Sequence, residues 1–319
     1  MLASNGLPNA RKISLDVPYF HVVFTLPHNL SALALQNKKV FYDLLFRVSA
    51  GTLIEVAADP KHLGAQIGFL SVLHTWGQNL QHHPHVHCVV PAGGIAPDHS
   101  HWVHPSTGFF LPVRVLSKVF RGKFVAGLKS LFRKRGLSFH GSLRSLADSK
   151  SFRCFLRQLF RKDWVVYAKR PFGGPEHVLH YLAQYTHRVA ISNHRLIAFQ
   201  DGQVTFRWKD YARGNKKRTM TVSVDEFLRR FLLHVLPRAF VRIRHFGFLT
   251  NRNRAALVPL CQQFLMETPR ERPPTLDYTR PSSEWLCPMC AAPMIVIEKL
   301  SAQQIRLRSA ERNSFVDTS

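Results

Sequence analysis

The chain has 319 residues, of which 45% are hydrophobic, enough to bury the core of one large domain or two small ones. Its 44 Lys and Arg against 19 Asp and Glu give a formal charge of +25, and such an excess indicates an anionic partner, most often nucleic acid. No segment approaches the roughly 18–20 apolar residues of a membrane span, no basic and then apolar leader is present, and the five cysteines are too scattered for a secreted disulfide scaffold, so we expect a cytosolic protein with no membrane partner.

Strands and helices alternate in the first half of the sequence. Residues 1–16 form a lead-in without a core pattern. Runs of aromatic and β-branched residues predict strands, and apolar residues at helical spacing predict a helix. The expected elements are a strand over Phe20–Leu26, a helix over Leu33–Ala50, a strand over Ile67–Thr75, a polar connection over residues 76–84, and a strand over His85–Val90 that ends at Pro91.

The second half combines basic helices with a β-hairpin. We expect helices over Val113–Arg135, Lys150–Asp163, Pro175–Arg188 and Asp225–Pro237, and strands over Trp164–Ala168, Leu196–Phe199, Val204–Trp208 and Met220–Val224. The turn Asp201–Gly202 is typical of a tight hairpin. This irregular alternation predicts an α+β fold with a mostly antiparallel sheet. One domain is expected over residues 17–265, followed by a linker and a mobile tail over residues 266–319.

A histidine pair is the most informative feature of the sequence. Side chains alternate between two faces of a strand, so His85 and His87 point the same way, while Val86 and Cys88 face an apolar layer. Two imidazoles on one face offer nitrogen ligands to a metal ion, which needs at least one more ligand. The alternatives are two histidines that only form hydrogen bonds on a half-buried sheet, and the first ligands of a zinc hydrolase.

Other histidines lie close to this pair in the sequence. His74 is on the preceding strand and is a candidate neighbour of the site. We expect His82 and His83 to lie in the connecting loop, near phosphate or solvent.

Two tyrosines lie four residues apart on a predicted helix. Tyr181 and Tyr185 share one face of this helix with Gln184 and Arg188. Alone, this spacing is more typical of two core aromatic residues, but the polar neighbours and basic surroundings favour a functional role. A tyrosine can attack phosphorus to form a covalent phosphotyrosine, although its hydroxyl, with an ordinary pKa of about 10, needs assistance. A metal ion that polarises the phosphate supplies this assistance, so the two pairs form a coherent chemical set.

At these residues the sequence resembles the HUH endonucleases, which are named for a His–hydrophobic–His motif, here His85-Val86-His87. More narrowly, it is similar to the two-tyrosine transposases of rolling-circle insertion sequences (the insertion-sequence-ninety-one family). The matching stretches are residues 17–27, 74–79, 82–88, 181–193 and 242–249, and the similarity extends over residues 17–265.

The resemblance implies a palm of antiparallel strands, ferredoxin-like or RRM-like, with helices on one side. It places the histidine pair on a central strand and the tyrosines on a helix that faces it. It also implies Mg²⁺ or Mn²⁺ as cofactor, single-stranded DNA at transposon ends and target as partner, and a location at the nucleoid of a bacterial cytosol. Gln184 and His74 are both candidates for the third metal ligand.

The implied reaction is a transesterification. A tyrosine attacks a phosphodiester of single-stranded DNA, retains the 5′ phosphate covalently and frees a 3′ hydroxyl. The second tyrosine allows a second cleavage before the first end is released, so strands can be exchanged and rejoined.

The chain departs from the family pattern at its start. Family members begin with a cysteine-rich zinc-binding region before the segment at residues 17–27, whereas this sequence has no cysteine before Cys88. We therefore expect this copy to lack that module, through truncation or loss. Cys287 and Cys290 supply only half of a zinc site, and a plain exposed pair is favoured over zinc binding there.

Basic and aromatic residues are interleaved between Ser151 and Arg254. This pattern is typical of proteins that hold single strands, with cations on phosphates and rings on bases. The best candidates for DNA contacts are Arg188, Arg213, Lys216, Lys217, Arg218, Arg242 and Arg244, four of which belong to an expected basic loop over residues 213–218.

Three functions are compatible with these features. The first is a transposase that nicks and rejoins single-stranded DNA. The second is a catalytically inactive, truncated relic of such an enzyme that still binds nucleic acid. The third is a zinc hydrolase of small molecules, which leaves the charge of +25 unexplained. The ordered motifs favour the first.

Overall fold

The computed structural model describes residues 14–105, 111–169, 190–210 and 216–267. The chain divides into two compact units, Met1–Thr268 and Pro269–Ser319. The second unit, with Cys287 and Cys290, lies outside the described residues, and the domain boundaries expected from the sequence stay predictions.

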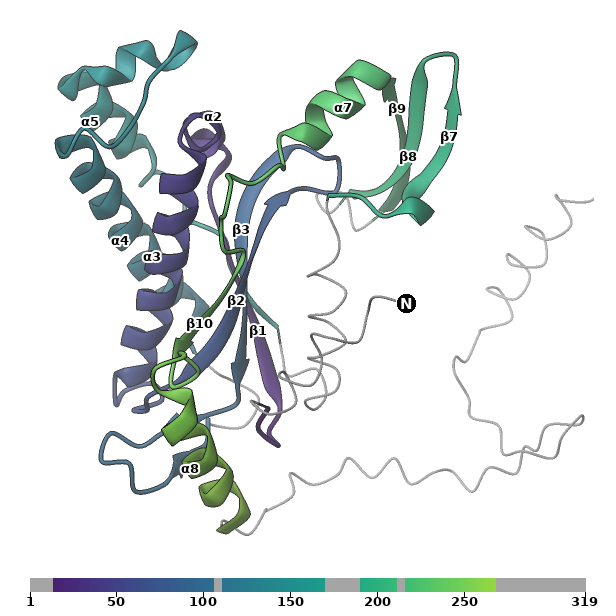
Figure 1. Ribbon diagram of the computed structural model, residues 1–319. Coiled ribbons are helices and arrows are strands. Elements are labelled where there is room, and N and C mark those ends of the chain that lie inside the picture. Colours follow the sequence, from purple (N-terminus) through teal and green to yellow (C-terminus); the bar gives the residue numbers. More distant parts are fainter. Residues whose placement is uncertain (1–13, 106–110, 170–189, 211–215, 268–319) are drawn as a thin grey trace, which may run out of the picture. The chain divides into compact units, whose positions relative to one another are not determined.

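A five-stranded antiparallel sheet forms the centre of the first unit (Figure 1). The strand order is β10-β2-β3-β1-β6, and every neighbouring pair is antiparallel. The strands are β1 (Tyr19–Thr25), β2 (Gly68–Trp76), β3 (His82–Pro91), β6 (Val166–Lys169) and β10 (Ile243–Gly247). The histidine pair therefore lies on the central strand, β3.

Four of these strands are connected in the ferredoxin-like manner. Along the chain the order is β1–α3–β2–β3–α4–β6, where α3 is Lys38–Ala58 and α4 is Val113–Arg133. Across the sheet, β3 lies between β2 and β1, and β1 lies between β3 and β6, which makes two interlocked split βαβ units. The predicted α+β fold with an antiparallel palm is confirmed, and β10 adds one strand at the edge of β2.

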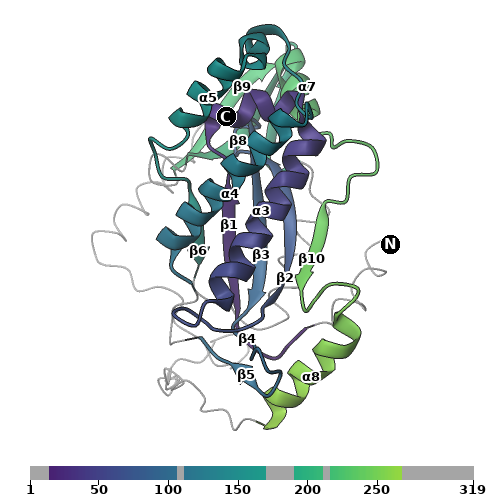
Figure 2. The ribbon, with the colours of Figure 1, turned by 90° about the vertical axis from the view of Figure 1, so that its left-hand side faces the viewer.

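Helices α3 and α4 pack on one face of this sheet (Figure 2). Val86, Cys88 and Val90 of β3 are completely buried in the core on this side. The rings of Phe120 and Trp164 pack with their centroids 5.4 Å apart in the same core, where each fully buried large apolar side chain contributes about 1.5–3 kcal/mol. This burial orients the alternate residues of β3 away from the helices.

The helix expected over residues 33–50 is broken at Asn37. Helix α2 (Ser31–Gln36) ends before Asn37, and α3 begins after it. The Asn37 side-chain amide donates hydrogen bonds to the carbonyls of Leu33 (3.0 Å) and Ser138 (2.9 Å). Its carbonyl accepts one from the Ser138 amide (2.7 Å). Asparagine side chains compete in this way with helical backbone hydrogen bonds, which explains the break.

A second antiparallel sheet, of order β7-β8-β9, packs against helix α7. Its elements are β7 (Leu196–Gln200), β8 (Gln203–Asp210), β9 (Lys216–Ser223) and α7 (Val224–Leu232). The predicted hairpin is confirmed, since Asp201 and Gly202 have φ of 50° and 69°, as a type I′ turn requires. The loop expected over residues 213–218 was wrong for residues 216–218, because their pairing with residues 208–210 continues the strand ladder.

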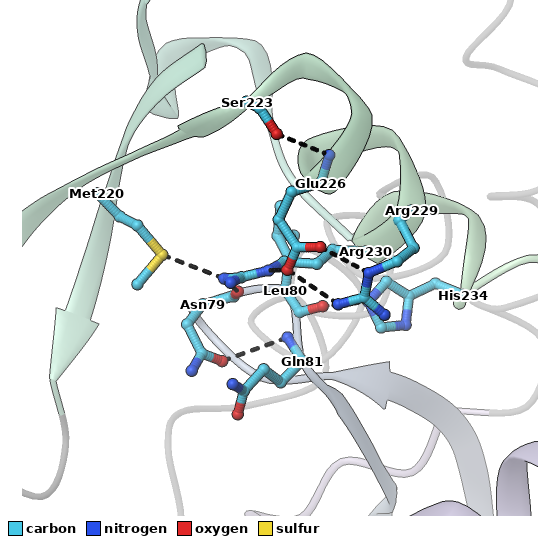
Figure 3. Close-up of polar contacts among 9 residues, drawn as sticks. All are labelled: Asn79, Leu80, Gln81, Met220, Ser223, Glu226, Arg229, Arg230 and His234. Atoms are coloured by element: carbon cyan, nitrogen blue, oxygen red, sulfur yellow. Dashed lines mark hydrogen bonds and ion pairs between the residues drawn. The ribbon is translucent and has the colours of Figure 1, made fainter. Parts of the chain in front are cut away.

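The tip of the β2–β3 hairpin, residues 77–81, docks onto this second sheet (Figure 3). Leu80 is completely buried in an apolar cluster with Phe206. Three carbonyl oxygens of the tip accept hydrogen bonds: Gln78 from Arg195, Asn79 from Arg230 Nη1 (3.2 Å), and Leu80 from His234 Nε2 (3.0 Å). Glu226 accepts a further bond from Arg230 Nε at 2.7 Å and so holds its guanidinium at the tip.

The remaining elements are the short 3-10 turns His28–Leu30, Gly141–Ala147 and Asn193–Arg195, with α5 (Ser149–Gln158), β4 (Gly94–Ile95), β5 (Trp102–Val103) and α8 (Arg254–Glu267). Helix α5 packs in the main core through Phe152 and Leu156, whereas β4, β5 and α8 contribute to a smaller core. Trp102 and Val258 pack with Tyr19 at the start of β1. Among the described residues, no helix has the length and apolar character needed to cross a membrane.

Candidate functional site

Three histidines from two adjacent strands come together on the sheet. The β2–β3 register places His74 directly opposite His85, and the alternation of β3 places His87 on the same face. One ring nitrogen from each of the three lies within 4.8 Å of those of the other two. His74 is buried, and His85 and His87 are half-buried. The predicted common orientation of His85 and His87 is thus confirmed, and His74 completes a set of three possible ligands.

A local irregularity in β3 shapes this group. Between the pairs His74–His85 and Trp76–His82 the register shifts, because β3 carries one extra residue there. Pro84 lies in this bulge, and proline has no amide to donate to a ladder. The sequence predicts that His82 and His83 lie in a loop, but both lie in β3. His82 is buried, and its Nε2 is hydrogen-bonded to the hydroxyl of Tyr42 at 2.9 Å.

Hydrogen bonds at Nδ1 orient two of the imidazoles. His85 Nδ1 donates to the carbonyl oxygen of His83 at 2.7 Å, so its Nε2 carries the lone pair. His87 Nδ1 is 2.7 Å from Nε2 of His21 on β1, and in the tautomer in which His87 donates this hydrogen bond, its Nε2 is free to bind a metal ion. Partners of this kind fix the ring and the tautomer of metal-binding histidines. Sequence reasoning missed His21, which only the β1–β3 register brings close to His87.

All three imidazoles are neutral at physiological pH. Burial lowers the pKa of His85 to about 4, and it takes the pKa of His74 and of His87 well below the ordinary 6.5. Nearby imidazoles act in the same direction. A metal ion needs the neutral ring, so the group is prepared as a ligand set. Three nitrogen donors suit Mn²⁺ and other transition ions better than Mg²⁺, which prefers oxygen.

A cation lies beside the histidines. Arg242 Nε donates to the carbonyl of Leu73 at 3.1 Å, and its guanidinium lies 5.1 Å from the centre of the Trp76 ring. The Trp76 ring in turn stacks on His74 with centroids 4.8 Å apart. The positive charge of Arg242 contributes to the lowered pKa of His74 and His87. An anionic group that approaches the histidines would therefore meet a fixed positive charge.

The other predicted DNA contacts lie elsewhere. Arg244 is on β10, where it pairs with Ser71. Its Nη2 forms an ion pair with Asp43 on α3 at 2.5 Å, so its charge is engaged on the helix side of the sheet. Lys216, Lys217 and Arg218 are exposed on β9, and Arg218 forms an ion pair with Asp210 at 3.3 Å.

Five predicted site residues lie outside the described residues. They are Tyr181, Gln184, Tyr185, Arg188 and Arg213. Their roles stay predictions from the sequence.

Sequence comparison identifies the family of the protein that carries this sheet and this histidine group. Residues 68–256 match the family model Y2_Tnp, which is described as "Putative transposase". The chain belongs to this family of transposases, and the family recognised from the ordered motifs is confirmed.

Two relatives match nearly the whole chain. The chain is 51% identical over 302 residues to "Putative transposase y4qJ" of Sinorhizobium fredii, covering 92% of this chain and 76% of that protein. It is 27% identical over 303 residues to "Transposase for insertion sequence element IS801" of Pseudomonas savastanoi pv. phaseolicola, covering 91% and 70%.

Solved structures of the relaxase TrwC are also similar. TrwC complexed with a 27-mer DNA comprising the recognition hairpin and the cleavage site matches with a TM-score of 0.28 and 14% identity, over 77% of this chain and 72% of that chain. A metal-bound structure of the conjugative relaxase TrwC with OriT DNA matches with a TM-score of 0.28 and 12% identity, over 52% and 69%. The family assignment rests on the sequence matches.

Proposed function

We propose that this protein is the transposase of a rolling-circle insertion sequence, which cleaves and rejoins single-stranded DNA through a covalent phosphotyrosine. The observation that carries the proposal is the group of His74, His85 and His87, three neutral imidazoles with their ligand atoms within 4.8 Å of one another. They occur in a member of a transposase family that also has two tyrosines at helical spacing, Tyr181 and Tyr185.

The histidines would hold a divalent ion through three ring nitrogens. When bound, such an ion withdraws electron density from a phosphate oxygen and stabilises the charge that develops during displacement. His74 is favoured over Gln184 as third ligand because its ring nitrogen lies within the same 4.8 Å group. The nitrogen donors favour Mn²⁺ over Mg²⁺, although Mg²⁺ is more abundant in cells.

The protein's own side chains perform the displacement. The hydroxyl oxygen of Tyr181 or Tyr185 loses its proton and forms a bond to phosphorus, while the bond from phosphorus to the 3′ oxygen breaks. The 3′ oxygen takes up a proton and leaves as a free hydroxyl, and the 5′ phosphate stays on the tyrosine. The reverse reaction with another 3′ hydroxyl rejoins a strand, so no external energy source is needed. Arg242 would attract the phosphate to the histidines.

Covalent capture of DNA tests this proposal. The full chain is mixed with 5′- or 3′-labelled single-stranded oligonucleotides and Mn²⁺, and the products are separated on a denaturing gel. We expect an adduct with the 5′ phosphate of the downstream fragment, lost in His85→Ala/His87→Ala and in the double change Tyr181→Phe/Tyr185→Phe. His62→Ala is the matched control, because His62 is exposed and outside the histidine group.

Two further variants test which residue is the third metal ligand. His74→Ala should abolish Mn²⁺ binding in calorimetry, while Gln184→Ala should leave it unchanged. If the protein binds DNA but forms no adduct with any of many sequences, in Mn²⁺ or in Mg²⁺, the catalytic proposal is refuted. The protein would then be a nucleic-acid-binding relic of a transposase.

A further inference from the structure

Positive charge accumulates in the helical part of the palm. Residues 113–162 contain 14 Lys and Arg but a single acidic residue, Asp148. The Asp148 carboxylate caps the start of α5, where it accepts a hydrogen bond from a backbone amide of the first turn at 2.8 Å. Two of the cations, Arg121 and Lys123, form ion pairs with carboxylates. The other cations have no carboxylate partner in the part of the chain that the structure describes, and their mutual repulsion favours an anionic ligand.

Helix α5 has one apolar side, which attaches it to the palm, and one polar side. Phe152 and Leu156 are buried in the main core. The Phe152 ring stacks on that of Phe132, near the carboxyl-terminal end of α4, with centroids 4.2 Å apart. Helix α5 therefore lies beside α4, on the outside of the helical layer (Figure 1). Its opposite side consists of exposed residues, which are Lys150, Arg153, Cys154, Arg157 and Gln158.

Further cations lie near both ends of α5. Arg144 belongs to the 3-10 turn that precedes the helix, and Arg161 and Lys162 follow it in the chain. Arg133 directly follows Phe132, so the end of α4 brings more positive charge close to α5. All four of these side chains are exposed. The helix therefore presents arginine and glutamine side chains at its centre, with lysine and arginine residues before and after them.

The composition of the exposed side distinguishes between anionic ligands. A helix that binds a membrane surface inserts apolar side chains, whereas Phe152 and Leu156 of α5 are buried in the core. A surface for single strands stacks bases on exposed rings, and the exposed side of α5 has none. Phe160, beyond the end of α5, is 47% exposed, but the guanidinium of Arg121 lies over its ring, 5.2 Å from the centroid. Paired DNA needs neither an apolar insertion nor a stacking ring.

The length and side chains of α5 suit the major groove of B-form DNA. This groove is about 12 Å wide and admits an α-helix. The helix has ten residues, and at 1.5 Å per residue it spans about 15 Å. Arginine and glutamine form paired hydrogen bonds with the edges of guanine and adenine, and Arg153, Arg157 and Gln158 lie on the exposed side. The cations near both ends of α5 are suited to the phosphates that border the groove.

We propose that α5 binds double-stranded DNA in its major groove, at a site separate from the histidine group. Helix α5 packs on the side of the sheet that the helices cover, whereas His85 and His87 face away from the helices. The palm therefore separates the two surfaces, and a duplex at α5 leaves the histidine group accessible to a single strand. The inference goes beyond the proposed function, because binding of a duplex at α5 requires neither a metal ion nor a tyrosine.

Cys154 provides a chemical probe in the middle of the proposed site. It is exposed, whereas Cys88 and Cys261 are buried. In the full chain with Cys287→Ser and Cys290→Ser, the rate of alkylation by a fluorescent maleimide reports access to Cys154. The rate is measured in EDTA at about 0.1 M salt and at higher salt. It is compared without DNA, with a 30-base-pair duplex of mixed sequence, and with a 30-nucleotide thymidine strand.

We expect the duplex to slow the alkylation of Cys154 by roughly fivefold or more, and the thymidine strand to slow it less than about twofold, because a covered thiol reacts slowly. Arg153→Gln/Arg157→Gln should raise the duplex concentration for half-maximal protection by roughly tenfold, with its salt dependence reduced by about two ions. The matched control, Arg252→Gln/Arg254→Gln, removes two exposed arginines at the start of α8 and should be protected as the wild type is. Circular dichroism checks that both variants are folded.

Fluorescence anisotropy of a labelled thymidine strand tests whether the two sites are separate. Saturation with unlabelled duplex should change the affinity for this strand by less than about threefold, and full competition would refute separate sites. Four results would overturn duplex binding at α5: no protection by the duplex, equal protection of the Arg153→Gln/Arg157→Gln variant, equal protection by the thymidine strand, or protection by phosphatidylserine vesicles in place of the duplex. Since EDTA removes divalent ions, these outcomes do not depend on the proposed cleavage, which the adduct assay tests separately.

Discussion

Leu80 at the tip of the β2–β3 hairpin combines strain with burial. Its φ is 62°, in the left-handed region, and its side chain is completely buried. A left-handed conformation costs a residue with a side chain about 1–2 kcal/mol. The conformation persists because Leu80 fills the apolar cluster with Val204 and Phe206, and because its carbonyl accepts a hydrogen bond from His234.

Substitutions at this residue separate the two effects. Leu80→Ala keeps the strain and loses the packing, which costs about 2–5 kcal/mol for a buried leucine. Leu80→Gly loses one more carbon, worth about 0.8 kcal/mol, and gains freedom in the unfolded chain worth about 0.5–1 kcal/mol. It also relieves the strain of about 1–2 kcal/mol. We therefore expect Leu80→Gly and Leu80→Ala to have about the same free energy of unfolding, instead of a clearly lower value for the glycine variant.

Hydrogen exchange of the amides in β8 and β9, with urea unfolding, measures these differences. A loss of about 3 kcal/mol speeds exchange through local opening by roughly a hundredfold. Leu228→Ala on α7 is the control, because Leu228 is 47% exposed and should change little. A Leu80→Ala variant within about 1 kcal/mol of the wild type would refute the packing argument. A glycine variant more than about 1 kcal/mol below alanine would refute the strain argument.

Three further predictions concern the palm and its acid stability. His21→Phe should weaken Mn²⁺ binding in calorimetry by about 10–100-fold, as loss of a partner that orients a ligand does, whereas unchanged affinity would exclude a role in orientation. Burial lowers the pKa of His234 to about 4. As the pH falls from 6.5 to 4, this imidazole is therefore protonated in the unfolded chain but stays neutral in the folded protein, and the free energy of unfolding falls. At pH 5 the buried neutral His234 should lower the free energy of unfolding by about 2 kcal/mol. In urea titrations, a His234→Asn variant should lose less stability over this pH range than the wild type. Gly247 has φ of 60°, and a β-carbon there would collide with the carbonyl of Ile67. Gly247→Ala should therefore lower the free energy of unfolding by more than about 2 kcal/mol. Gly202 also has a positive φ, 69°, but a β-carbon there would lie in open space, so Gly202→Ala should cost only about 1 kcal/mol. Equal melting temperatures of the two variants would contradict this.

The local parts of the site could be predicted from the sequence. The common face of His85 and His87 follows from the two-residue period of a strand, which needs no knowledge of neighbours. The proximity of His74 depends on the β2–β3 register, so the sequence left it as one of two candidates. The contact of His21 with His87 joins residues 66 positions apart and could not be predicted from spacing.

Errors arose where tertiary contacts override local composition. The polar run before Pro84 suggested a loop, but Tyr42 on α3 binds His82 and keeps it in β3. The break at Asn37 depends on its bonds to Ser138, a residue of a distant segment. The alternation of helices and strands, by contrast, was sufficient to predict the antiparallel α+β fold.

The late position of β10 in the chain has a consequence for biosynthesis. Strand β2 is an edge strand until β10 (Ile243–Gly247) pairs with it. Translation at about 5–20 residues per second leaves this edge uncovered on the ribosome for roughly 10–30 s after β2 has emerged. Unpaired edges are templates for association between chains. Nascent chains of this protein on one messenger are therefore exposed to pairing through β2, and conditions that slow translation between β2 and β10 should increase its aggregation.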